Sequence, residues 1–118
     1  MSLKERLRHL ATRLAARALR PLFRAHEEAN ARARKNAEAL IAACRAYQAR
    51  HGQLPETLEA LVPDFLPALP SARYDGPHFG FRYTADASGG HHVLEWTDTA
   101  PFGRPFYVFE EDRWGYLD

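Results

Sequence analysis

The residues that could hold a metal lie in the last third of the sequence. His91 and His92 are adjacent, and His78 and Asp98 are the conceivable additional ligands. On a strand, neighbouring side chains point to opposite faces of the sheet, so the two histidines cannot hold one ion together. A closed zinc site needs four ligands, and no recognised Cys/His spacing is present. We therefore predict no metal site.

Residues that could act as nucleophiles or general acids are equally scattered. The serines and threonines of the second half fall in expected turns or at strand ends, and none follows a strand-to-helix elbow. Three acids, Glu110 to Asp112, fall at an expected hairpin tip, where carboxylates are usually solvated. A hydrolase or metalloenzyme is the least favoured class, so we predict a non-enzymatic protein with no catalytic residue, cofactor or small-molecule substrate.

The chain has the length and composition of one small globular domain. It has 118 residues, of which 46% are hydrophobic, and this argues against disorder of the whole chain. The single cysteine, Cys44, cannot form an internal disulfide and lies among alanines on an apolar helical stripe. We expect Cys44 to be a small residue of the core.

The first 24 residues are strongly basic. Their seven cations oppose Glu5 alone, which gives 7 − 1 = +6, and the rest of the chain then carries +1 − 6 = −5. Leucines recur at spacings of three and four, as on one stripe of an amphipathic helix. Arginine is too frequent here for a membrane span. The predicted partner contacts are Leu3, Leu7, Leu10, Leu14, Arg6, Arg13 and Arg17.

The chain is predicted to divide into a basic amphipathic arm over residues 1–25 and a compact domain, the body, over residues 26–118. Pro21 is expected to kink or end the helix of the arm. A second helix is expected over residues 27–51, with Leu40, Ile41 and Cys44 on its buried side. Gly52 should end that helix in the left-handed conformation.

A short second helix is expected next. Pro55 suits a first helical position, and Leu58 and Leu61 repeat at helical spacing before Pro63. About two turns can form, which need the long helix as a packing partner. A proline-marked connection over residues 63–77 leads on from it.

From His78 the pattern alternates with period two, which indicates strands. The expected strands are residues 78–84, 91–97, 105–110 and 113–118, with turns at 85–90 and around Glu111 and Asp112. In the second strand, Leu94 and Trp96 share the face predicted to be buried. The fold class is therefore α+β, with a long N-terminal helix, a short second helix and a three- to four-stranded antiparallel sheet packed on the long helix.

This order of elements resembles the soluble domains of type II secretion pseudopilins and related type IV pilin-like proteins. The resemblance rests on "LIAACRAYQARHGQLPETLEALVPDFLPALP", residues 40–70, and on aromatic strands such as "FGFRYTAD". It covers the organisation of residues 29–118. It implies a structural or interaction module of a secretion-type assembly, associated with the inner membrane on the periplasmic side of the bacterial cell envelope.

The sequence departs from that family in two places. Residues 3–24 stand where the family has a long apolar helix, but their arginines do not suit a bilayer or a fibre core. Major pseudopilins also bind calcium in a loop near the C-terminal strands. The equivalent "TDTAPFGR" has Asp98 as its only carboxylate, so binding of an ion that needs six or more oxygens is not expected.

Two partner hypotheses remain open. In the first, the N-terminal helix binds a protein partner or a second copy, with an anionic membrane surface as a further possibility. In the alternative, the chain is a basic-arm binding protein whose residues 3–24 contact anionic lipid or nucleic acid. Nucleic acid is disfavoured because the body is net acidic and its aromatic strands carry few cations.

Overall fold

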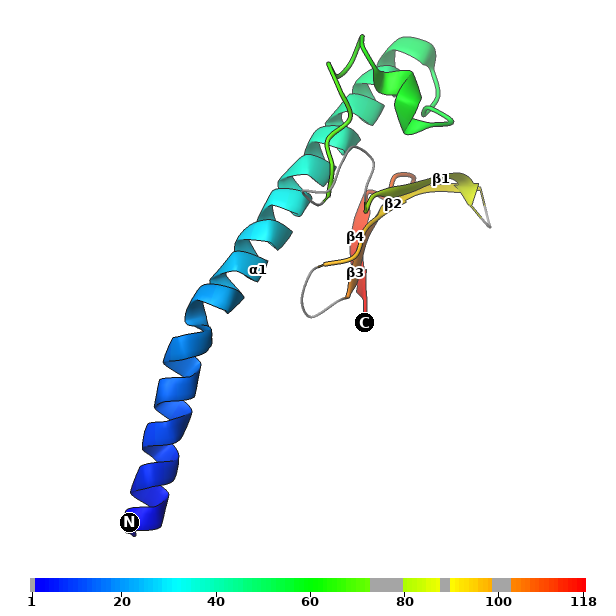
Figure 1. Cartoon of the computed structure of the whole chain (residues 1–118). Coiled ribbons are helices and arrows are strands. Elements are labelled where there is room, and N and C mark those ends of the chain that lie inside the picture. The colour runs from blue at the N-terminus through cyan, green and yellow to red at the C-terminus, as the bar shows by residue number, and fades with distance from the viewer. Residues whose placement is uncertain (1, 73–79, 88–89, 99–102) are drawn as a thin grey trace.

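The computed structural model describes residues 2–72, 80–87, 90–98 and 103–118 (Figure 1). The elements are the helix α1 (Leu3–His51), the 3-10 turn η1 (Leu58–Leu61) and the strands β1 (Arg82–Ala87), β2 (His91–Glu95), β3 (Arg104–Val108) and β4 (Arg113–Leu117). The four strands form one antiparallel sheet in the order β1-β2-β3-β4. The predicted α+β class is confirmed.

Both ends of α1 are capped. The Glu5 amide donates to the Ser2 hydroxyl, and the Ser2 amide donates to the Glu5 carboxylate, each at 3.2 Å. This capping box satisfies backbone donors that have no partner within the helix. At the other end Gly52 has φ 81° and donates its amide to the Gln48 carbonyl at 2.8 Å. The predicted helix end at Gly52 is confirmed.

Pro21 lies inside α1 and does not end it. Of the two expected outcomes, an end at Pro21 was wrong, whereas the axis of α1 does change direction in its N-terminal half (Figure 1). A proline costs one helical hydrogen bond and displaces the carbonyl four residues earlier. Here the side chain is exposed and the flanking residues are mostly Ala, Leu and Arg, so water can solvate that carbonyl while strong helix formers continue the helix.

The core lies between the C-terminal half of α1, η1 and one face of the sheet. Leu40, Cys44 and Leu94 are fully buried, and Trp96 is 3% exposed. Ring pairs extend this core, with Phe81 edge-on to Trp96 at 5.6 Å and Trp96 edge-on to Trp114 at 6.0 Å. The predicted buried faces of the helix and of β2 are confirmed.

The short helix is a single 3-10 turn and not two α-helical turns. It begins after Thr57, and Pro55 lies outside it as a buried residue. The Tyr83 hydroxyl of β1 donates to the Pro55 carbonyl at 2.5 Å. In a helix that started at Pro55, this carbonyl would accept a hydrogen bond from a backbone amide of the helix. In the structure it accepts one from Tyr83 of the sheet. A tertiary contact thus shortened the predicted helix.

The first strand begins later than predicted. Of the expected strand, residues 78 and 79 lie outside the described residues. Gly80 has φ 97°, so the chain turns before β1 starts at Arg82. Residues 85 to 87, expected in a turn, belong to β1, where the pairing register shifts between Thr84 and Ala87. The last hairpin turns over residues 109–112, which include the predicted turn around Glu111 and Asp112, but β3 ends at Val108 and not at Glu110 as predicted.

Candidate interaction surface

The N-terminal half of α1 extends away from the sheet (Figure 1). Leu3, Leu7, Leu10 and Leu14 are 73%, 56%, 53% and 57% exposed, and among the α1 side chains that the structure describes the first half-buried one is His26. With about 100° per residue, these four leucines lie within about 60° of the helix circumference. We call them the leucine stripe. They form the apolar surface that the spacing predicted.

The three predicted arginines belong to a longer row. Arg6, Arg13, Arg17, Arg20 and Arg24 are all exposed and follow one another at helical spacing. At about 100° per residue this arginine ladder lies about 80° from the leucine stripe. Among the described residues, no carboxylate forms an ion pair with any of the five. Arg20 and Arg24 extend the row beyond the three predicted arginines, and the steps of four, three and four after Arg13 place them on it.

The leucine stripe does not lie on the side of α1 that faces the sheet. Ala33, Ala37, Leu40 and Cys44 define the sheet-facing side, and at about 100° per residue it lies roughly a third of a turn from the stripe. Leu19, which is 44% exposed, lies instead on the sheet-facing side. A flat partner could therefore contact the leucine stripe without meeting the sheet.

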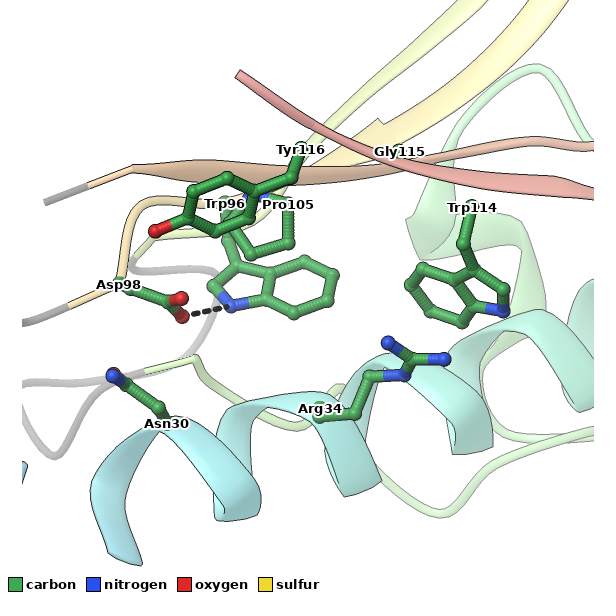
Figure 2. Close-up of a pocket in the computed structure, with 8 residues that line it drawn as sticks. All are labelled: Asn30, Arg34, Trp96, Asp98, Pro105, Trp114, Gly115 and Tyr116. Carbon is green, nitrogen blue, oxygen red and sulfur yellow. Dashed lines mark hydrogen bonds between the residues drawn. The ribbon is translucent and has the colours of Figure 1, made fainter. Parts of the chain in front are cut away.

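A groove of 390 Å³ opens between α1 and the sheet. Figure 2 shows its aromatic wall, formed by Trp96, Trp114 and Tyr116, and the polar residues opposite. The Arg34 guanidinium carbon lies 3.4 Å from the centre of the Trp114 ring. The Trp96 indole nitrogen donates to Asp98 Oδ1 at 3.2 Å. The charged groups of the groove are thus already engaged with its own rings.

Asp98 occupies a less polar setting than an ordinary surface carboxylate. Burial raises its pKa, and the hydrogen bond from Trp96 lowers it in part. This carboxylate was the only calcium-ligand candidate in its loop, and residues 99–102 of that loop lie outside the described residues. Its raised pKa favours the uncharged acid, and one of its oxygens already accepts a hydrogen bond from Trp96. Both features make Asp98 a poor ligand for a hard cation. We interpret the groove as the end of the core.

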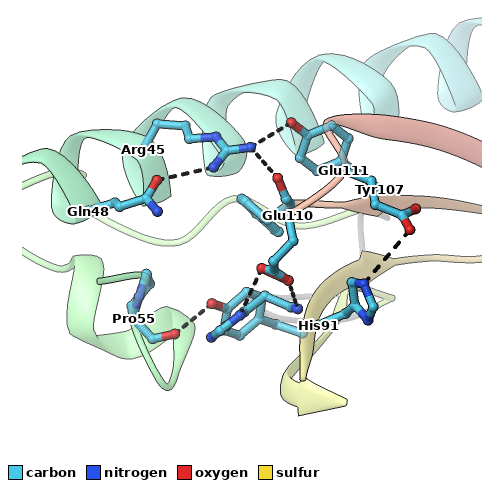
Figure 3. Close-up of polar contacts among 10 residues, drawn as sticks. Arg45, Gln48, Pro55, His91, Tyr107, Glu110 and Glu111 are labelled. Carbon is cyan, nitrogen blue, oxygen red and sulfur yellow. Dashed lines mark hydrogen bonds and ion pairs between the residues drawn. The ribbon is translucent and has the colours of Figure 1, made fainter. Parts of the chain in front are cut away.

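A polar network holds the last hairpin against α1 (Figure 3). Arg45 Nη2 donates to the Tyr107 hydroxyl at 3.0 Å and to the Phe109 carbonyl at 2.6 Å, and Nη1 donates to Gln48 at 3.1 Å. Tyr107 also donates to the Asp112 carboxylate. Sequence reasoning missed this contact because its partners are more than sixty residues apart, and only the i, i+3 spacing to Gln48 is local.

The acids of the hairpin tip are paired with the neighbouring histidines. His92 Nδ1 lies 3.1 Å from Glu110 Oε2, and His91 Nε2 lies 3.8 Å from Glu111 Oε1. The acids are exposed, as predicted, but Glu110 and Glu111 also have histidine partners, which the sequence reasoning did not anticipate. The two histidines bind different acids. Within the described residues, no three His, Cys, Asp or Glu side chains come together as a metal site would require.

Two further groups bear on function. Cys44 is fully buried, and burial raises the pKa of its thiol to about 12, which makes it unreactive as a nucleophile. In the part of the chain that the structure describes, no helix has both the length and the hydropathy to cross a membrane.

Comparisons with protein families, with curated proteins and with solved structures gave no match to this chain.

Proposed function

We propose that this chain is a non-enzymatic, pilin-like structural or interaction module in which the N-terminal half of α1 makes the contact. The observation that carries the proposal is the exposure of the leucine stripe, whose members are 53% to 73% exposed. Contiguous apolar surface of this kind marks interaction sites on proteins. The sheet, which buries its own aromatic residues against α1, is the part that the module presents.

The pilin-like part of the proposal rests on the order of the elements. A long helix is followed by a short turn, a proline-marked connection and an antiparallel sheet, and residues 40–70 carry the specific resemblance. By that resemblance we propose a place in a secretion-type assembly at the bacterial inner membrane, on its periplasmic side. A protruding N-terminal half-helix suits such an assembly because it can pack beside other subunits without disturbing the sheet.

The size of the stripe limits what it can do alone. Each leucine contributes about 1.5 to 3 kcal/mol on full burial, and these leucines start partly covered, so four contribute about 4 to 8 kcal/mol. Association costs about 4 to 15 kcal/mol. A contact made by the stripe alone is thus weak, and a stable one needs many copies or a second attractive term.

Paired variants of the full chain test the proposal. Leu7→Gln with Leu10→Gln removes the centre of the stripe, whereas Thr12→Gln with Leu19→Gln changes two exposed positions of the same helix outside the stripe. We expect the wild type and the second variant to associate, with themselves or with lipid vesicles, and the first variant to lose that association. Sedimentation velocity and vesicle flotation measure the two forms. A wild type that stays monomeric and ignores vesicles of every composition contradicts the proposal.

A further inference from the structure

We infer that the partner of the N-terminal half of α1 is an anionic lipid surface, on which this half lies in the plane of the interface. The inference rests on the proposed function, because it names the partner of the same leucine stripe. Three features carry it: the relation of the leucine stripe to the arginine ladder, the unpaired charge, and the position of the sheet.

The stripe and the ladder run side by side along the helix. The stripe extends from residue 3 to residue 14 and the ladder from residue 6 to residue 24, and the four leucines and five arginines that form them are exposed. A helix of 22 residues is about 33 Å long. Helices that lie in a membrane interface have this arrangement: their apolar side chains enter the acyl boundary, and their cationic side chains reach the headgroups. Arginine suits the flank because its stem covers apolar surface while its guanidinium binds phosphate.

The charge of the arm favours an anionic lipid surface over a second copy of this chain as the partner. Residues 1–24 carry +6, with Glu5 as the only acid. If two copies packed along their stripes, two unpaired arginine ladders would come within about one Debye length, which is about 8 Å in physiological salt. Repulsion would oppose the weak apolar contact. On an anionic surface the same charges supply the second attractive term that the stripe lacks.

The position of the sheet permits this orientation. Since the sheet-facing side of α1 lies roughly a third of a turn from the stripe, leucines that point into the lipid leave the sheet beside the helix and above the surface. The body, with a net charge of −5, is repelled by the same surface.

Flotation of the full chain tests the inference. The probes are vesicles of phosphatidylcholine alone and vesicles that contain about 30% phosphatidylglycerol. We expect binding to the anionic vesicles, weakened by salt, and little binding to the neutral ones. Arg13→Gln with Arg17→Gln should lower the partition coefficient about fivefold for each charge. Lys35→Gln with Arg50→Gln removes the same charge from the body end of α1 and should change it little.

Each other outcome has a definite meaning. Equal loss in both charge variants, or equal binding to neutral vesicles, overturns the inference. Leucine-dependent oligomers without vesicle binding overturn it as well, but leave the proposed function standing. Binding of soluble polyglutamate without vesicle binding assigns the arm to an acidic protein. The near-ultraviolet circular dichroism of Trp96 and Trp114 shows in every variant whether the body is intact.

Discussion

Arg45 of α1 and Tyr107 of β3 are hydrogen-bonded across the interface between helix and sheet, with 3.0 Å between Nη2 and the hydroxyl oxygen. The same nitrogen donates to the Phe109 carbonyl at 2.6 Å. One half-buried guanidinium therefore fixes both the end of β3 and the turn that follows it. This contact explains how an open four-stranded sheet keeps its position on a single helix.

We predict that Arg45→Met destabilises the fold by about 1 to 3 kcal/mol. Methionine preserves the packing of the stem, whereas the buried Phe109 carbonyl and Tyr107 hydroxyl lose a charged donor. Urea unfolding measures the difference. Arg50→Met, at an exposed position of the same helix, should change stability by less than about 0.5 kcal/mol. Equal effects of the two substitutions would show that the network contributes nothing.

The turn η1 offers a matched pair of neighbouring positions. Leu61 is fully buried and Ala60 is exposed. Leu61→Asp buries a carboxylate without a partner, so we expect a loss of more than about 3 kcal/mol or failure to fold. Ala60→Asp should be nearly neutral. Thermal unfolding compares them, and similar melting temperatures would mean that η1 is not packed against α1.

Substitution by alanine should destabilise the protein at two glycines, for different reasons. At Gly52 no atom lies within 4 Å of an added Cβ, but φ is +81°, so Gly52→Ala costs only backbone strain, about 1 kcal/mol. Asparagine tolerates this conformation and should cost less. At Gly115 an added Cβ would overlap with the Phe106 ring, so alanine forces repacking. We expect Gly115→Ala to be worse than Gly52→Ala in urea unfolding, and the reverse order would contradict both explanations.

The sequence was informative where one local rule decided the structure. The apolar spacing identified Leu40, Cys44, Leu94 and Trp96 as core residues, and the preference of glycine for the left-handed conformation identified Gly52 as a helix end. It failed where distant residues decided: Tyr83 takes the Pro55 carbonyl and shortens the second helix. At Pro21 a general rule was outweighed by exposure and by helix-forming neighbours. At the candidate interaction surface, leucine spacing alone predicted the leucine stripe. The position of the stripe relative to the sheet could be determined only from the structure.

Cys44 makes stability and reactivity depend on pH. Burial raises its thiol pKa from 9.0 to about 12, so the folded state favours the neutral thiol. The resulting contribution to stability is complete below pH 9 and is lost as the pH rises from about 9 to about 12. At pH 8 a thiol reagent should modify this single cysteine only after unfolding in urea. Equal rates with and without urea would show that Cys44 is not buried.

The central claim is that the N-terminal half of α1 is an interaction surface separate from the body. Amide hydrogen exchange tests it most directly, in the free chain and with anionic vesicles. A helix half without packing partners opens readily. We predict fast exchange over residues 3–20 in the dilute free chain and strong protection there on vesicles, while residues 33–51 stay protected throughout. Slow exchange of residues 3–20 in the free chain, or no response to vesicles or to protein concentration, would contradict the claim.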